Sequence, residues 1–153
     1  MSVNYYFKRK NTPEVRHRIV TLLEDNNFAE AKKIVTELDD GIHLGSSHPN
    51  WKFAVEHNTK YGNVPPFEPN KKSLYNYIDL MITGDDAEFE LQDEYGRIVT
   101  AENIKKEIES RSHDFGMKEY YQKYPDREAE CIIKPDEYET ICDGIRFIHT
   151  EFY

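Results

Sequence analysis

The sequence YETICDGIRFIH at residues 138–149 decides the fold class of this chain. Two short runs of β-preferring residues flank Asp143 and Gly144, a dipeptide that favours a type I′ turn because both positions require positive φ. We therefore predict an antiparallel hairpin with strands at 138–142 and 145–149. It is the clearest strand pair in the sequence.

Strand patterns also occur earlier in the chain. Aromatic residues gather near the N-terminus, and residues 87–92 alternate apolar with polar side chains, which is typical of a half-buried strand. The strands predicted before the hairpin, with one turn at 45–50, are 3–8, 42–44, 51–57, 87–92 and 97–99.

Helical patterns lie between these strands. Ser73 and Thr100 have the hydroxyl side chains typical of helix N-caps, and we expect the helices that follow them to end at Gly84 and near Arg111. Because strands and helices are interspersed while the clear strand pair is antiparallel, we predict the α+β class. The predicted architecture is a mainly antiparallel sheet with an N-terminal helical hairpin and two further helices. Residues 58–70 are predicted to be an exposed loop, and residues 112–128 show no regular pattern.

The helical hairpin is predicted as an insertion at about 12–39. Thr12, Pro13 and Glu14 supply a hydroxyl cap, a proline at the first helical position and an acid near the positive end of the helix dipole. Polar residues at 25–27 separate two helices. Apolar side chains at helical spacing form a stripe on each helix: Val15, Ile19, Leu22 and Leu23 on the first, and Phe28, Ala31, Val35 and Leu38 on the second.

The length and composition predict one domain spanning 1–153, because 153 residues suffice for a single hydrophobic core. No run approaches the roughly 18 apolar residues of a membrane helix, and the N-terminus lacks a secretory signal, so we expect a soluble, cytoplasmic protein without membrane contact. Cys131 and Cys142 are expected to remain thiols in a reducing compartment.

The charge distribution bears on the choice of partner. The formal net charge is -9, yet residues 1–20 carry five basic side chains and one acid, a local charge of +4, which leaves -13 on the remainder. Such a surface repels phosphates over most of its area, so direct nucleic-acid binding is disfavoured. A protein partner with a basic surface is favoured.

Residues 41–53 combine His43, His48, Ser46, Ser47 and the single tryptophan. The histidine spacing matches no common zinc pattern, and the glycine, serine, proline and asparagine residues are also typical of a turn. Nucleophilic catalysis requires a base and an orienting group near the serine, which this stretch does not specify. We therefore predict no metal, no cofactor and no catalytic residue.

A small binding pocket is the alternative interpretation of this stretch. Arginines bind anions by forked hydrogen bonds, and aromatic rings stack on flat ligands, so a nucleotide or another anionic ligand fits the available side chains. This alternative requires the following residues to converge: His43, Ser47, Trp51, Tyr95, Arg97 and Arg146.

Six carboxylates lie within ten residues without a basic residue between them: Asp85, Asp86, Glu88, Glu90, Asp93 and Glu94. On a strand, alternate side chains point the same way at about 7 Å spacing, close to the spacing of phosphates along one nucleic-acid strand. The block therefore fits a surface that mimics DNA charge. A solvated strand face whose acids deter edge pairing explains the same residues and is the favoured interpretation of the block.

Several motifs in this order resemble a group of small uncharacterised proteins of tailed bacteriophages. The motifs are Tyr5-Tyr6, His43-Leu44-Gly45-x-Ser47 leading to Trp51-x-Phe53, Asp93-Glu94-Tyr95-Gly96-Arg97, and Asp143-Gly144-x-Arg146-Phe147 leading to Glu151-Phe152. Relatives often carry a cysteine-rich segment before the histidine strand, where this chain has its helical hairpin. The resemblance implies a phage origin and no particular chemistry.

Three functional hypotheses follow from the sequence. The first is a phage accessory protein that acts without catalysis in the infected bacterial cell by binding a host or defence-system protein, with DNA mimicry as one means. The second is a ligand-binding or enzymatic domain built on the pocket residues above. The third is a virion or morphogenesis component. The sequence favours no particular oligomeric state.

Overall fold

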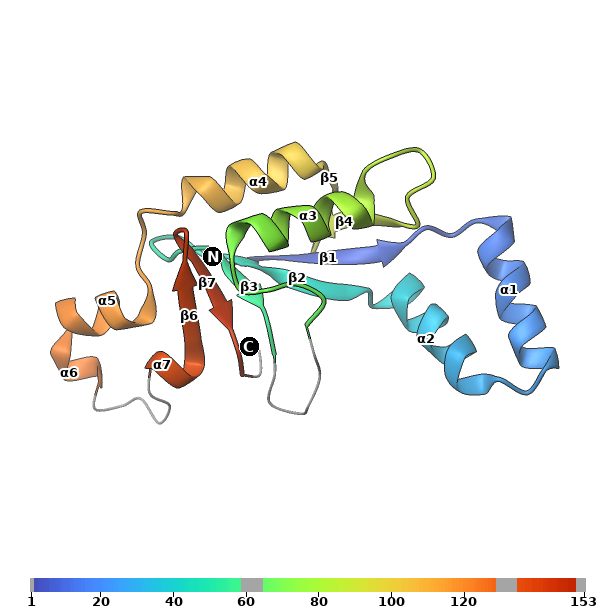
Figure 1. The fold of residues 1–153 in the computed structure, drawn as a ribbon, viewed down its shortest axis with the longest axis horizontal. Coiled ribbons are helices and arrows are strands. Elements are labelled where there is room, and N and C mark those ends of the chain that lie inside the picture. The colour runs from blue at the N-terminus through green and yellow to red at the C-terminus, as the bar shows by residue number, and fades with distance from the viewer. Residues whose placement is uncertain (1, 59–64, 129–134, 151–153) are drawn as a thin grey trace.

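A seven-stranded sheet runs through the centre of the structure, a computed structural model that describes residues 2–58, 65–128 and 135–150 (Figure 1). The strand order is β5-β4-β1-β2-β3-β7-β6, and every neighbouring pair is antiparallel except β3 and β7. The strands are β1 (Val3–Arg9), β2 (Ile42–Ser47), β3 (Ala54–Glu56), β4 (Phe89–Asp93), β5 (Ile98–Val99), β6 (Glu139–Cys142) and β7 (Ile145–Ile148).

Three longer elements besides the sheet were expected, and all three form. They are the hairpin of α1 (Pro13–Glu24) and α2 (Phe28–Asp39), then α3 (Lys71–Ile82), then α4 (Ala101–Ser110). Two short helices lie in the stretch 112–128, which shows no regular sequence pattern: α5 (Met117–Lys123) and α6 (Pro125–Glu128). A third, α7 (Pro135–Tyr138), precedes β6. The predicted α+β class is confirmed.

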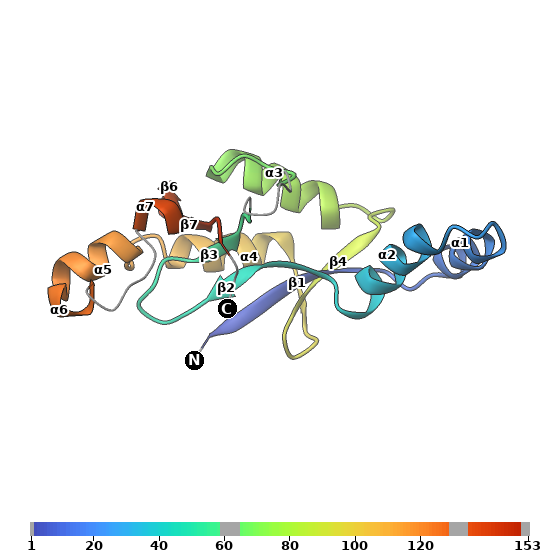
Figure 2. The ribbon, with the colours of Figure 1, turned by 90° about the horizontal axis from the view of Figure 1, so that it is seen from below.

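The core lies between one face of the sheet and helices α3 and α4, which are on the same side of it (Figure 2). The strands contribute buried side chains such as Phe7, Leu91 and Phe147, and the helices contribute Leu74 and Ile78 from α3 with Ile104 and Ile108 from α4. The described helices leave the opposite face of β1 and β2 uncovered.

The C-terminal hairpin forms as its dipeptide predicts. Asp143 and Gly144 have φ values of 54° and 77°, and Cys142 pairs with Ile145 across the turn. Thr12 and Thr100 cap α1 and α4 through their hydroxyl oxygens, which accept hydrogen bonds from backbone amides at 3.2 and 3.1 Å. These local predictions are confirmed.

The predicted turn at 45–50 and the predicted strand at 51–57 differ from the structure. Gly45, Ser46 and Ser47 belong to strand β2 and not to a turn, because each pairs with a residue of β1. Only Ala54–Glu56 of the predicted strand 51–57 is a strand, while Trp51 forms an isolated bridge with Phe115.

The helix α3 begins earlier than predicted. Asn70 is its N-cap, and its side-chain Oδ1 accepts a hydrogen bond from the amide of Ser73 at 2.8 Å. The predicted cap, Ser73, is therefore already inside the first turn. Asparagine is as good an N-cap as serine, so residue type alone did not distinguish Asn70 from Ser73.

The hairpin of α1 and α2 extends beyond the end of the sheet, away from α5 and α6 (Figure 1). It joins β1 to β2 and is attached mainly through α2, whose Ala31 and Ile34 are buried. Glu37 of α2 forms an ion pair with Arg9 of β1 at 2.7 Å. Within the predicted apolar stripe of α2, Ala31 is buried whereas Phe28 and Val35 are exposed.

Among the described residues, no helix combines the length and apolar character needed to cross a membrane. Cys142 is a free thiol, and burial together with the neighbouring Asp143 carboxylate raises its pKa. Cys131, residues 59–64 of the predicted loop and the motif residues Glu151 and Phe152 lie outside the described residues.

Candidate functional site

Trp51 and Arg146 are the two predicted pocket residues that the fold brings into contact. The Arg146 guanidinium lies over the Trp51 ring, 4.7 Å from its centroid. The contact depends on the parallel pairing of β3 with β7, in which Ala54 is the partner of Arg146. The Tyr120 ring of α5 lies 4.7 Å from the Trp51 ring and adds an aromatic neighbour.

Arg146 is held by one carboxylate. Its Nε donates a hydrogen bond to Glu139 Oε2 at 2.6 Å, and the other oxygen of Glu139 accepts a bond from the amide of Met117. Glu139 is buried, so the ion pair is shielded from solvent. The Glu139 carboxylate therefore holds two groups at once, the Arg146 guanidinium of β7 and the backbone amide of Met117 at the start of α5.

Trp51 and Arg146 line a pocket of about 360 Å³. Its other lining residues are Ser2, Asn4, Ser46, His48, Ala54, Met117 and Tyr138. Sequence reasoning did not select Asn4, Ser46 or Glu139 for this site. Their convergence follows from strand register and not from any local motif, so no short-range signal was available.

His43 lies next to this pocket but does not line it. Its Nε2 is 3.1 Å from Asn4 Oδ1, its Nδ1 is 3.7 Å from Glu56 Oε2, and its ring packs on Tyr6. Because Asn4 Oδ1 can only accept, the proton of this bond is on His43 Nε2. His43 therefore orients Asn4 and is a neighbour of the site.

Ser47 points to the opposite, helix-covered face of the sheet. Its hydroxyl donates a hydrogen bond to Glu107 Oε1 of α4 and accepts one from Arg111 Nε at 3.2 Å. Arg111 Nε also contacts the Glu107 carboxylate at 3.3 Å. The arrangement joins β2 to α4.

Tyr95 and Arg97 belong to the turn between β4 and β5. Buried Asp93 accepts hydrogen bonds from the amides of both residues, at 2.9 and 3.0 Å, and from Arg97 Nε at 2.7 Å. Burial alone would raise the pKa of Asp93, but these hydrogen bonds and the Arg97 charge hold it below its usual range. The Arg97 guanidinium also lies over the Tyr95 ring, 5.3 Å from its centroid. The predicted pocket residues are thus divided among separate places: Trp51 meets Arg146, Tyr95 meets Arg97 in a different turn, and the six do not converge.

The acidic block does not form one uniform row. Asp93 is buried in its turn, Glu88 pairs with Arg9 at 3.3 Å, and Glu94 accepts a hydrogen bond from the amide of Asn4 at 3.1 Å. Glu90 accepts a bond from Gln92, while Asp85 and Asp86 are exposed in the loop before β4. Several of the six carboxylates therefore have structural partners.

A contact between buried His57 and half-buried His149 was not predicted from the sequence. His57 Nε2 donates to the Phe67 carbonyl at 2.9 Å, and His149 Nδ1 lies 3.1 Å from the His57 carbonyl and 3.2 Å from His57 Nδ1. Since carbonyls only accept, both rings satisfy this network in their neutral forms. Burial lowers the pKa of His57 against the effect of the Phe67 hydrogen bond, and the His149 ring lowers it further.

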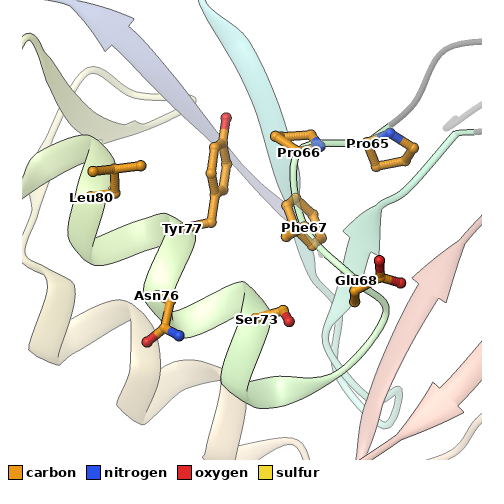
Figure 3. A pocket seen from close by; sticks show the side chains of 8 residues that line it. All are labelled: Pro65, Pro66, Phe67, Glu68, Ser73, Asn76, Tyr77 and Leu80. Carbon is orange, nitrogen blue, oxygen red and sulfur yellow. The ribbon is translucent and has the colours of Figure 1, made fainter.

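The histidine pair fastens the segment 65–68 to the sheet. The side chains of Phe67 and Tyr77 lie next to each other where this segment passes α3, with ring centroids 5.2 Å apart (Figure 3). A second pocket of about 410 Å³ lies between the segment and α3, and exposed Leu80 is at its edge. Its lining includes the polar side chains of Glu68, Ser73 and Asn76 but, unlike the Arg146 pocket, no arginine.

Within residues 2–58, 65–128 and 135–150, no group of three or more histidine, cysteine, aspartate or glutamate side chains is placed to hold a metal ion. Comparison with protein-family models, with curated proteins and with solved structures finds no match to this chain.

Proposed function

We propose that this chain is an accessory protein of a tailed bacteriophage that binds a host or defence-system protein in the cytoplasm of the infected cell and has no catalytic role. The observation that supports this proposal is the exposed apolar surface of the helical hairpin, which we call the hairpin surface. Its residues are Val20 and Leu23 of α1 with Phe28 and Val35 of α2, and 46 to 61 % of each is exposed.

The hairpin surface has the features of a protein contact. The helix α1 has an apolar stripe but no buried residue, so the fold itself gains little core from it. Large apolar side chains grouped on an element that extends from the domain are typical of interaction sites. Full burial of one such side chain contributes about 1.5–3 kcal/mol, so four suffice for a specific contact.

The charge of the chain favours a basic partner. With a net charge of -9, the protein attracts a positively charged surface at long range and speeds the encounter. Glu24 and Asp25 lie at the tip of the hairpin, next to Phe28 in sequence, so apolar and acidic groups occur together there. DNA mimicry would rest on Asp85, Asp86 and Glu88 and has less support.

The test is capture of a partner with variants of the hairpin surface. Affinity-tagged wild type and the double variant Val20→Asp, Leu23→Asp would be expressed in infected cells, and retained proteins identified by mass spectrometry. We expect a host or defence protein at near-equal stoichiometry with the wild type, and its loss with the double variant because carboxylates cannot enter an apolar contact.

Leu80→Asp is the matched control, because Leu80 is 79 % exposed on α3, away from the hairpin. It carries the same kind of change and should retain the partner. Retention of the same partner by the double variant would refute the role of the hairpin surface. Absence of any stoichiometric partner with the wild type would refute the proposed function itself.

A further inference from the structure

Four residues on adjacent strands form a row across the uncovered face of the sheet. Asn4 pairs with Ser46, Ser46 pairs with Ala54, and Ala54 pairs with Arg146, so the row crosses β1, β2, β3 and β7. Paired residues of neighbouring strands point to the same face at a spacing of about 5 Å. The small side chain of Ala54 leaves a hollow between the polar residues, and all four residues line the pocket of about 360 Å³.

The row carries hydrogen-bond donors that the protein does not use. The side chain of Arg146 is only 11 % exposed, and its Nε is bound to Glu139. Among the described residues, neither Nη1 nor Nη2 has a hydrogen-bond partner, so four N–H groups remain available. No polar side-chain atom in the same part of the chain is both fully buried and unsatisfied, so these donors reach the pocket.

Asn4 and Ser46 add donors from the other side of the hollow. Asn4 Oδ1 is bound to His43 Nε2, which fixes the orientation of the amide and leaves its Nδ2 as the donor. The Ser46 hydroxyl has no partner among the described residues. A forked guanidinium on one side with an amide and a hydroxyl on the other suits a group with several acceptor oxygens.

We propose that this row, Asn4, Ser46 and Arg146 around Ala54, binds the phosphate group of a small phosphate ester. The Arg146 fork takes two oxygens, and Asn4 and Ser46 take the others, as the tetrahedral shape of phosphate allows. The pocket is larger than a phosphate ion. Trp51, Met117 and Tyr138 line its remaining part and contact the organic portion of the ester. This site is independent of the hairpin surface.

Trp51 provides the readout, because it is the only tryptophan of the chain and its ring contacts Arg146. Tryptophan fluorescence would be followed while inorganic phosphate, ribose 5-phosphate or ribose is added at constant ionic strength, which keeps charge screening unchanged. We expect saturable changes with phosphate and with ribose 5-phosphate, tighter for the ester, and no change with ribose. No saturable change with either phosphate compound, or an equal response to ribose, would overturn the proposal.

Two variants test the row separately. Arg146→Lys keeps the charge and the pairing with Glu139 but removes the fork, so we expect affinity for ribose 5-phosphate to fall about tenfold or more. Ser46→Asp leaves the Arg146–Glu139 pair untouched and places a carboxylate in the row, which should abolish binding. Arg127→Lys is the matched control, because Arg127 lies over the Tyr120 and Tyr124 rings and does not line the pocket. Wild-type affinity in both row variants, with circular dichroism showing an intact fold, would refute the assignment.

Discussion

At Gly45 a side chain would collide with the neighbouring strand. A Cβ atom there would overlap the carbonyl oxygen of Ala54 and lie 3.0 Å from the Cα of Val55, both in β3. We expect Gly45→Ala to lower the free energy of unfolding by about 3 kcal/mol, because two backbones must separate. Urea unfolding measures this loss.

Gly96→Ala is the comparison for that substitution. Gly96 has a φ of 82°, and a Cβ there would meet nothing within 4 Å. The cost is then only that of a left-handed backbone, about 1 kcal/mol. A loss at Gly45 no larger than the loss at Gly96 would show that the close approach of β2 and β3 is unimportant.

The His57 and His149 pair makes stability depend on pH. The pKa of His57 lies below its ordinary value of 6.5, so the unfolded chain takes up this proton more readily than the folded protein. The contribution of His57 is complete above about pH 6.5 and is lost as the pH falls below that value. Protonation would place one N–H group against another at the 3.2 Å contact with His149.

The variant His57→Asn isolates this effect. We expect the difference in unfolding free energy between wild type and variant to shrink from about pH 7.5 to about pH 5.5, because only the wild type loses this contribution on acidification. Urea unfolding at several pH values gives the difference directly. A difference that is constant across this range would contradict the prediction.

Single residues were predictable from sequence where their role is local. Thr12 and Thr100 cap helices because their hydroxyl oxygens accept hydrogen bonds from backbone amides three residues further on. Asp143 and Gly144 form a tight turn because both residues adopt positive φ. Arg146 was singled out by its chemistry. Its contact with Trp51, by contrast, needs the pairing of Ala54 with Arg146, 92 positions further on, which no local pattern contains.

Among the elements, α3 offers a direct test of its starting point. Asn70→Ala should lower the free energy of unfolding by about 1 kcal/mol, because the amide of Ser73 loses its side-chain acceptor. Ser73→Ala should cost much less, since that hydroxyl is not the cap. Thermal or urea unfolding measures the two losses. A larger loss for Ser73→Ala than for Asn70→Ala would identify Ser73 as the cap.

The predicted element boundaries were wrong where pairing between distant strands outweighed the turn-forming composition of a segment. The Gly45-Ser46-Ser47 run has turn-forming residues, yet these residues pair with β1 and, in part, with β3. On α2 the predicted apolar stripe includes Phe28 and Val35, which are exposed. The buried residues of this helix are Ala31, Ile34 and Glu37. Both helix faces carry apolar side chains, so periodicity alone did not identify the one that meets the sheet.

At the scale of the whole molecule, the hairpin is separable from the core. The helix α1 buries no residue, and α2 contributes mainly Ala31, Ile34 and the Glu37–Arg9 ion pair. Replacing residues 11–40 with a short turn should therefore give a folded protein of lower stability. Cooperative thermal unfolding monitored by circular dichroism checks this, and a chain without a cooperative transition would show that the hairpin is required for folding.

The parallel pairing of β3 with β7 has a consequence for the order of events during synthesis. Val55 of β3 is fully buried, as is Phe147 of β7, its register partner. The two strands are nevertheless far apart in the chain, because every described element from α3 to β6 lies between them. Until β7 leaves the ribosome, β3 has one edge without its native neighbour, and such an edge is prone to pair with other chains. Formation of this strand pair is also slow, because the long intervening segment loses conformational entropy before the contact between the strands is gained. A nascent chain halted before residue 145 should therefore aggregate far more readily than the finished protein.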